Sequence, residues 1–532
     1  MAVSVIIPAY NNADTIGRTV SAAHSIAGAA EVIVVDDGSR DATAETAREA
    51  GADQVVVLPR NTGKGAAMSA GVAAVRSPTV LFLDADLAES AALTGPLVDA
   101  VGGGYAMSVA IFPMQPGGGG FGLARGLAAA AIRLIGGIEV TAPLSGQRAI
   151  PKALVEHLGL ASRFGVETAL TAEAALLGIP IVEVPLPLEH AHTGRTAAGF
   201  LHRARQFKDI LRYALLAAYG LSWPALTSAE ALGRTAVWLM AFAVIIAFAA
   251  ATEPQAVTHI IIAALAGIIA WIPCLWISAV WLRLRRPNYV GCSLPGAAGL
   301  VLPIVALPLL LLPGLPQDIR AAALVVLSVL GVVGLLDDLY GSRHQARGLR
   351  GHLRALLSRR LTTGGMKAVG GLAAGVAAGA LLSPGRPAVI VLDALLIALC
   401  ANSVNLLDLR PGRALKGFAI ICAIALLASP GSLYLLGPML ALALVPAPAE
   451  FAGRVMLGDV GANVLGGAAG IGLVIALSPW QRLVAVLTLL AFHFLCERVS
   501  FSELVRRNRV LAWLDALGTG HVPPLPTREA VP

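Results

Sequence analysis

The sequence has few cysteines and few charged residues for its length, and both shortages narrow the class of protein. Its five cysteines are Cys274, Cys292, Cys400, Cys422 and Cys496. They lack the close spacing of a zinc site and predict no disulfide framework. Only 13% of the 532 residues are charged, whereas 57% are hydrophobic and the mean hydropathy is +0.76. The chain is therefore too long for one domain and too apolar to lie wholly outside a membrane.

The sequence also shows no secretion signal, because it begins directly with a strand pattern. The formal net charge is +7, but Arg gathers in short loops between apolar segments. This pattern is typical of cytoplasmic loops, so the basic excess does not indicate nucleic acid. We expect a cytoplasmic α/β domain at 1–220, an all-α multi-pass membrane domain at 230–500 and a cytoplasmic tail at 501–532.

Short β-branched runs alternate with helix-compatible segments in the first domain. The expected strands cover 3–8, 31–35 and 55–58, and a further apolar run leads into Asp84. This alternation predicts a mostly parallel sheet with helices on both faces. Acidic or Gly-rich turns follow successive strands at 36–39 and 60–65, which indicates a nucleotide site along one sheet edge.

The apolar run at 81–83 ends in Asp84-Ala85-Asp86. Two carboxylates that follow a buried strand suit Mg²⁺ or Mn²⁺, held together with the phosphates of a substrate. Taken alone, such a triplet is usually a pair of solvated loop acids. The acidic and Gly-rich turns that follow other strands of the same domain strengthen the interpretation as a metal site.

Four stretches, VIIPAYNN, VVDDGS, NTGKGAA and LFLDADL, together resemble the family-2 inverting glycosyltransferases with the nucleotide-diphosphosugar-binding (GT-A) fold. The resemblance covers residues 1 to about 215 and is closest to the branch that acts on polyprenyl phosphates or similar small acceptors. It implies donor-binding residues within these motifs: Pro8, Asp36, Asp37, Lys64 and Asp84. It also implies that Asp84 and a catalytic Asp86 hold the cation, which stabilises the charge of the leaving diphosphate.

Further residues of this domain are candidates with open alternatives. Glu167 is either the general base for an acceptor hydroxyl, a group that orients a phosphate acceptor, or a helix-start acid favoured by the dipole. Arg148 lies in a turn (LSGQRA) that shapes the sugar or acceptor pocket in such enzymes. His190 is a candidate metal ligand, since a histidine in this region completes the site in some relatives. Arg195 is a candidate for binding a lipid phosphate. It opens a basic amphipathic segment at 199–218, which lies either in the membrane interface or against the domain.

Ten apolar segments of the second half are expected to span a bilayer. Their approximate ranges are 232–251, 257–282, 294–313, 319–336, 367–382, 388–407, 415–429, 432–447, 460–477 and 481–497. With the first domain in the cytoplasm, the cytoplasmic loops and their edges hold 14 Lys and Arg residues, against three for the external ones. This asymmetry supports the topology.

The polar residues of the membrane half fall at the cytoplasmic ends of the expected spans. They are Asp337, Asp338, Asn402, Asn405, Asp408 and Asp459. Carboxylates at this depth are costly and usually functional, and convergent Asp and Asn side chains fit Mg²⁺.

The stretches PNYVGCSLPGAAGL, GLLDDLYG, NSVNLLD and MLGDVGAN, with the Lys367 region, resemble the polyprenyl-phosphate N-acetylhexosamine-1-phosphate transferases over about 257–518. The resemblance implies that Asp337 and Asp338 act at the lipid phosphate and metal and that Lys367 contacts a phosphate. It implies a nucleotide-sugar contact at Asn405 and metal ligands at Asp408 and Asp459.

Three departures separate this half from that family. The family has a second Asp soon after the position of Asp408, where this chain has Leu409-Arg410-Pro411-Gly412. Its His-rich cytoplasmic motif is missing here, and glycine replaces the usual threonine after Pro295. These departures leave open whether this half is catalytic.

The leading interpretation is a multi-pass bacterial inner-membrane glycosyltransferase that moves a sugar from a nucleotide diphosphosugar to a polyprenyl-linked acceptor in cell-envelope glycan synthesis. One alternative is a bifunctional enzyme, whose membrane half makes a polyprenyl-diphospho-sugar that the first domain extends. Another is a catalytically inactive membrane half that acts as a lipid-binding anchor. The sugar, the acceptor and the oligomeric state stay open.

Overall fold

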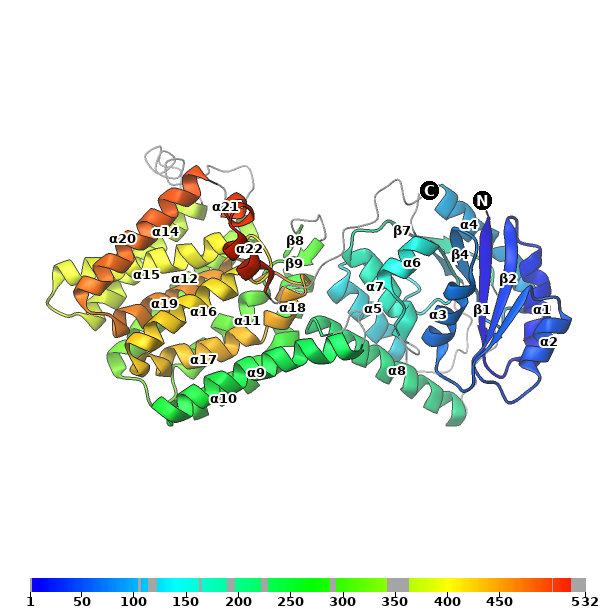
Figure 1. The fold of residues 1–532 in the computed structure, drawn as a ribbon, viewed down its shortest axis with the longest axis horizontal. Helices are drawn as coiled ribbons and strands as arrows, with labels where there is room; N and C mark the ends of the chain where they lie inside the picture. The colour runs from blue at the N-terminus through cyan, green and yellow to red at the C-terminus, as the bar shows by residue number, and fades with distance from the viewer. Residues whose placement is uncertain are drawn as a thin grey trace.

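We describe the protein from a computed structural model, over residues 2–103, 107–112, 122–161, 165–188, 197–221, 228–287, 293–341, 363–499 and 501–517. An α/β domain and a helical bundle lie side by side (Figure 1). The expected change of architecture near residue 220 is therefore seen in the fold.

The α/β domain is built on a seven-stranded sheet of order β3-β2-β1-β4-β6-β5-β7. The strands are β1 (Val3–Ala9), β2 (Ala29–Asp36), β3 (Gln54–Val57), β4 (Thr79–Phe82), β5 (Met107–Ile111), β6 (Arg148–Pro151) and β7 (Ile181–Pro185). The helices are α1 (Ala13–His24), α2 (Thr43–Glu49), α3 (Lys64–Ala74), α4 (Gly95–Gly102), α5 (Leu123–Ile135), α6 (Lys152–Leu158), α7 (Val166–Leu176) and α8 (Ala197–Ala218).

Strands β1 to β4 pair in parallel, as the alternating pattern predicts, whereas β6 runs antiparallel between β4 and β5. The reversal brings the beginning of β6 to the edge where β1, β2 and β4 end. Phe82 pairs with Arg148 across this boundary. The turn before β6 therefore lies beside the segment that follows β4.

Side chains alternate between two cores, one on each face of the sheet. Ile6 and Phe82 enter one cluster, and Ile7 and Leu81 enter the other. This alternation follows from the period of two in a strand and requires helices on both faces. The rigid sheet fixes the carboxyl ends of its strands in space.

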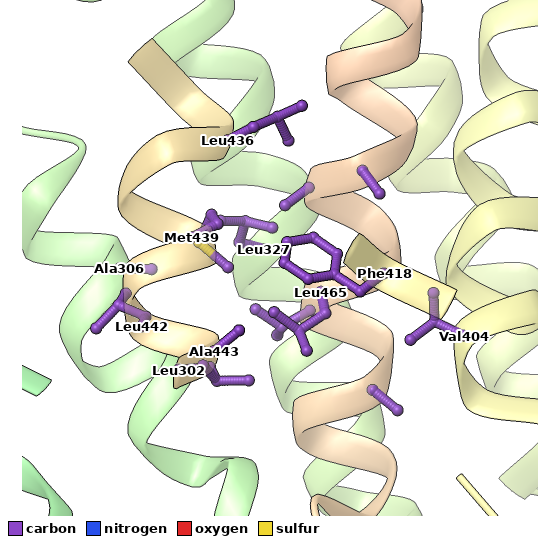
Figure 2. Packing of buried hydrophobic residues seen from close by; sticks show 14 of the residues in the cluster. Leu302, Ala306, Leu327, Val404, Phe418, Leu436, Met439, Leu442, Ala443 and Leu465 are labelled. Atoms are coloured by element: carbon purple, nitrogen blue, oxygen red, sulfur yellow. The ribbon is translucent and has the colours of Figure 1, made fainter. Parts of the chain in front are cut away.

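The second half is a bundle of mostly apolar helices. They are α9 (Ser228–Thr252), α10 (Ala256–Trp276), α11 (Val301–Leu309), α12 (Gln317–Tyr340), α14 (Thr363–Leu382), α15 (Pro387–Leu407), α16 (Arg413–Ala428), α17 (Leu433–Leu444), α18 (Ala447–Phe451), α19 (Gly458–Ala476), α20 (Pro479–Arg498), α21 (Phe501–Arg507) and α22 (Arg509–Ala516), with a short hairpin of β8 (Arg285–Pro287) and β9 (Ser293–Pro295). Figure 2 shows Leu327, Phe418, Met439 and Leu465 in the core of this bundle.

Each of the ten expected spans contains a helix, but only seven helices among the described residues are long and apolar enough to cross a membrane. Those of the expected segments 294–313, 415–429 and 432–447 are shorter. Proline explains why two of these helices end early. Pro308 lies in the last turn of α11, and Pro430 follows α16. The count of ten spans is therefore not confirmed.

The amphipathic segment forms α8, and one of its faces packs against the domain. Ile210, Tyr213 and Ala217 are buried, whereas Leu211 and Leu215 are exposed. Packing against the domain, one of the two alternatives for this helix, is therefore observed along the buried face. The exposed leucines leave a membrane contact for the other face as a prediction.

A buried ion pair joins the two halves of the molecule. Arg454, between α18 and α19, donates to Glu173 of α7 at 3.0 Å, and Tyr213 of α8 donates to the same carboxylate oxygen at 2.9 Å. The side chains of Arg454 and Glu173 are 4% and 0% exposed. Arg285 of β8 also donates to the carbonyls of Leu134 and Ile135 at the end of α5. The bundle thus contacts two helices of the α/β domain through polar groups.

We predict that Arg454→Met lowers the stability of the full chain by about 3–5 kcal/mol, because it leaves the Glu173 carboxylate buried without its cation. Adding Glu173→Gln should recover part of the loss. Thermal unfolding of the detergent-solubilised protein measures both. Arg18→Met, which breaks the exposed pair with Glu89, is the control and should change little. An equal effect of Arg454→Met and Arg18→Met would contradict a structural role for the buried pair.

Candidate active site

The segment after β4 places Asp84 and Asp86 at the carboxyl edge of the sheet. Leu83 donates its backbone N–H to Ile6 at 3.0 Å, which continues the pairing with β1 past the end of β4. The carbonyl of Ala85 then accepts hydrogen bonds from the hydroxyls of Thr15 and Thr19 on α1, each at 3.0 Å. Helix α1 therefore holds the turn that carries both carboxylates.

Lys64 is the central cation of the site. Its ammonium lies 2.6 Å from Asp84 Oδ1 and 2.6 Å from Glu167 Oε1. Burial by itself would lower the pKa of Lys64, but the two carboxylates outweigh it and raise that pKa above its usual value. The structure thus joins residues from α3, α7 and the segment after β4 in one charged group.

Glu167 begins α7 and is almost fully buried, with its side chain 5% exposed. One carboxylate oxygen contacts Lys64, and the other, Oε2, is buried without a hydrogen-bond partner among the described residues. A buried acceptor of this kind is suited to a hydroxyl or amide of a ligand. Its position in the first turn also agrees with the dipole interpretation.

The turn before β6 closes over this charged group. Gln147, fully buried, donates from Nε2 to Asp84 Oδ2 at 2.6 Å. A Cβ on Gly146 would lie 2.5 Å from Asp84 Oδ1 and 2.7 Å from Lys64 Nζ, so a larger residue would displace the ends of these two side chains. The sequence pattern drew attention to this turn but did not single out Gln147 or Gly146. The sequence feature that could have indicated these two residues is their position in the turn beside Arg148.

Arg148 is fully buried and does not face an open site. Its guanidinium donates to the carbonyls of Ser145 and Glu167 and to the hydroxyl of Thr171. These bonds attach the turn to α7. This placement makes Arg148 a support of the site, whereas the sequence interpretation had it facing the acceptor.

The two acids after β2 shape the neighbouring loop. Asp37 accepts hydrogen bonds from the backbone of Thr62 and Gly63 at 2.7 and 2.8 Å, which fixes the approach to Lys64. Asp36 accepts one from the backbone of Ser39 at 3.0 Å. Pro8 is half-buried near the end of β1. All three predicted donor residues therefore lie on the same sheet edge as Asp84, and their contact with a nucleotide stays a prediction.

A second polar cluster lies in the bundle. Lys367 of α14 contacts Asp337 of α12 at 2.5 Å and Asp459 of α19 at 2.9 Å. Arg286 of β8 pairs with Asp338 at 3.1 Å. The predicted residues Asp337, Asp338, Lys367 and Asp459 are therefore brought together. Each carboxylate is already partnered by a cation.

Asp338 of this cluster and Asp408 both cap α19. Asp338 accepts hydrogen bonds from the backbone of Asp459 and Val460 at 3.1 and 3.0 Å. Asp408 accepts one from Gly458 at 2.9 Å. Carboxylates are favoured at a helix N-terminus, so both acids have a structural function here. Asn405 lies one turn before Asp408, and its Oδ1 has no hydrogen-bond partner in the described part of the chain.

Two predicted site residues, His190 and Arg195, lie outside the described residues. Within the described ranges, no group of three or more His, Cys, Asp or Glu side chains is arranged to hold a metal ion. The metal-ligand predictions for Asp84, Asp86, Asp408 and Asp459 thus stay predictions.

Comparison with known proteins assigns a class to the α/β domain. Residues 4–129 match the family model described as Glycosyl transferase family 2. This match confirms the prediction of a glycosyltransferase domain. It ends well before the membrane half and carries no information about that half.

Individual relatives match only part of this chain. Glycosyltransferase AglJ of Haloferax volcanii is 33% identical over 195 residues, which are 35% of this chain and 62% of the relative. The undecaprenyl-phosphate 4-deoxy-4-formamido-L-arabinose transferase of Edwardsiella ictaluri is 40% identical over 112 residues, which are 19% of this chain and 34% of the relative. The chain therefore spans less than two thirds of either protein.

Among solved structures, glucosyl-3-phosphoglycerate synthase from Mycobacterium tuberculosis with Mn²⁺, uridine diphosphate and phosphoglyceric acid is 26% identical. The match covers 40% of this chain and 77% of that one, with a TM-score of 0.35.

The ion pairs of Lys64 predict a specific pH dependence of stability. Because its pKa is raised above 10.5 in the folded state, the stabilisation is complete below about pH 10.5 and is lost as the pH rises further. Lys64→Met removes the cation between Glu167 and Asp84. The variant should therefore unfold at a lower temperature at neutral pH, and the deficit should shrink above about pH 10.5, where the parent protein begins to lose this stabilisation.

Thermal unfolding from about pH 3 to about pH 11 measures this dependence. Lys208→Met, an exposed position on α8, is the control. A deficit of Lys64→Met that stays constant across this range would contradict the predicted ion-pair origin.

Proposed function

We propose that this chain is a membrane-bound glycosyltransferase that moves a sugar, with inversion, from a nucleotide diphosphosugar to a polyprenyl phosphate at the cytoplasmic face of a bacterial inner membrane. The observation that carries the proposal is the Lys64 ammonium held between Asp84 and Glu167 at the sheet edge, inside a domain matched to glycosyl transferase family 2. Relatives named for transfer to undecaprenyl phosphate support the choice of acceptor. A product of this kind would serve cell-envelope glycan synthesis.

The contacts of Glu167 favour an acceptor that is already ionised. The Lys64 ammonium, 2.6 Å from one oxygen of Glu167, places positive charge at this position, which attracts an anionic acceptor such as a phosphate. A phosphate acceptor needs no base. The unpartnered Oε2 then accepts a hydrogen bond from a sugar hydroxyl and orients the sugar for attack.

The residues present fit a divalent cation that binds together with the substrate. Mg²⁺ is commonly held by one or two carboxylates plus substrate phosphates, and Asp84 and Asp86 offer two at this edge. Both oxygens of Asp84 accept hydrogen bonds from Lys64 and Gln147, so Asp84 would exchange one of these partners for the cation. When bound, the cation supplies positive charge at the leaving diphosphate. Lys64 adds its own positive charge beside that position and keeps Asp84 in place.

A second activity in the membrane half is the alternative. Lys367 and Arg286 bring two cations into a cluster with three carboxylates, an arrangement that a lipid phosphate could enter by exchanging partners. The half would then either make a polyprenyl-diphospho-sugar or hold a polyprenyl phosphate without transferring to it. The capping function of Asp338 and Asp408 is consistent with both.

One experiment separates these activities. Purified full-length protein is incubated with undecaprenyl phosphate, Mg²⁺ or Mn²⁺ and a panel of radiolabelled UDP- and GDP-sugars, and label in the lipid phase is followed. We expect lipid product that Asp86→Asn abolishes and Asp338→Asn spares. Release of UMP that only Asp338→Asn abolishes would establish the alternative. No lipid product with any donor would contradict both proposals.

Gly146 provides a sharper test of the site geometry. We predict that Gly146→Ala lowers kcat for sugar transfer on the order of 100-fold, because its methyl group displaces Asp84 and Lys64. Gly95→Ala is the matched control, since a Cβ there meets nothing within 4 Å. Equal activity of the two variants in the lipid-product assay would show that Asp84 and Lys64 are not part of the active site.

A further inference from the structure

The last described helix, α22, is anchored to the bundle in a fixed orientation. Figure 1 shows α21 and α22 at the end of the bundle nearest the α/β domain. Arg413 of α16 binds both carboxylate oxygens of Asp515, at 2.6 and 2.7 Å. Lys416 donates to the carbonyls of Leu514 and Asp515 at the end of α22. Because a two-point Arg–carboxylate pair fixes direction as well as distance, the face of α22 that carries Asp515 is turned toward the bundle.

The other face of α22 is apolar and exposed. Val510, Trp513, Leu514 and the C-cap residue Leu517 recur at the spacing of one helical stripe. Val510 is 65% exposed and Trp513 is 62% exposed. An exposed stripe with a tryptophan is unusual for a surface that faces only water.

Basic residues border this stripe. Arg506, Arg507 and Arg509 are exposed at the end of α21 and the start of α22. Glu503 pairs with Arg506 and Arg507, which leaves an excess of positive charge beside the apolar face. Apolar side chains edged by arginine suit a surface with anionic head groups over acyl chains.

Helix α20, which comes before α21, has the same kind of exposed apolar surface. Helix α20 is long and apolar enough to span a membrane. Only 6% of the residues in its apolar stretch are buried inside the protein. Leu487, Leu490 and Phe494 are exposed along it. The helix ends at Arg498, whose guanidinium lies 4.2 Å from the centre of the Phe494 ring. Helix α21 separates the end of this span from α22, so the exposed stripe begins at Val510, shortly after the span ends.

We propose that α22 lies in the head-group region of the cytoplasmic leaflet, with its stripe of Val510, Trp513, Leu514 and Leu517 against the acyl chains. Arg506, Arg507 and Arg509 then face lipid phosphates. The inference rests on the proposed placement of the bundle in the membrane. Tryptophan at the border of a bilayer and arginine near anionic lipid are both favoured positions.

This contact has a consequence for the second polar cluster. The loop between Asp408 and Arg413 is held on one side by Arg413 and Asp515, and on the other by Gly412, which donates to Glu450 at 2.9 Å. Lipid that binds α22 therefore stabilises the loop next to Asp408.

The test uses the full-length protein in nanodiscs of phosphatidylcholine and phosphatidylglycerol, after Cys292→Ser and Cys496→Ser. A nitroxide is placed at Val510→Cys, and its collision rates with oxygen and with a polar nickel chelate are compared. We expect oxygen to dominate at position 510. Asp515→Asn should increase the mobility of this label and reduce the dominance of oxygen.

Two further labels make the outcomes distinct. Val57→Cys, 51% exposed on β3, is the water-facing control, where the nickel chelate should dominate. Leu487→Cys on α20 reports the placement of the bundle. A polar environment at 487 overturns both the membrane placement and this inference. A lipid environment at 487 with a water-like response at 510 overturns this inference alone, as does a label at 510 that neither reagent reaches, which indicates a protein cover.

Discussion

The charged group formed by Lys64, Asp84 and Glu167 is the interaction on which the arrangement of the site depends. Glu167 is almost fully buried and Lys64 and Asp84 are partly buried, so their charges are costly unless they satisfy one another. Each comes from a different part of the domain, so pairing them fixes α3, α7 and the segment after β4 relative to one another. The turn at Gly146 and Gln147 closes against the same group. The group therefore orders the sheet edge before any ligand binds.

Helix α7 connects this charged group to the helical bundle. Its first turn carries Glu167, and its far end carries Glu173, which binds Arg454 of the bundle. A few residues after Arg454, the chain begins α19, whose first N–H groups are capped by Asp338 and Asp408. One helix and one short segment thus connect the two polar clusters. A rigid connection of this kind would hold the α/β domain in a fixed position relative to the helical bundle.

The two polar clusters differ in how their side chains are partnered. At the sheet edge, Glu167 retains an unpartnered buried oxygen, and the surrounding motifs match a known family. In the bundle, Lys367 and Arg286 already neutralise the carboxylates, and two of the acids also cap a helix. Among the described residues, both clusters therefore retain an unpartnered side-chain oxygen, in Glu167 and in Asn405, and only the first lies in the part of the chain that the family model matches.

The sequence by itself determined the features that depend on local pattern. Strand and helix alternation predicted the parallel sheet, apolar runs predicted the helices of the bundle, and motif order placed Asp36, Asp37, Lys64 and Asp84 along one edge. Periodicity and strand order are properties of neighbouring residues, so they can be read without a structure.

Only the tertiary structure decided which side chains meet and how deeply they are buried. Arg148 looked available to a substrate in the sequence but is enclosed by α7 and its own turn. Arg454 and Glu173 are 281 residues apart, and no local pattern indicates that they pair. The apolar stripe of α22 became apparent only once Asp515 showed which face is turned inward. Burial and pairing depend on segments that are distant in the chain, and which of them packing brings together is not encoded in any local pattern.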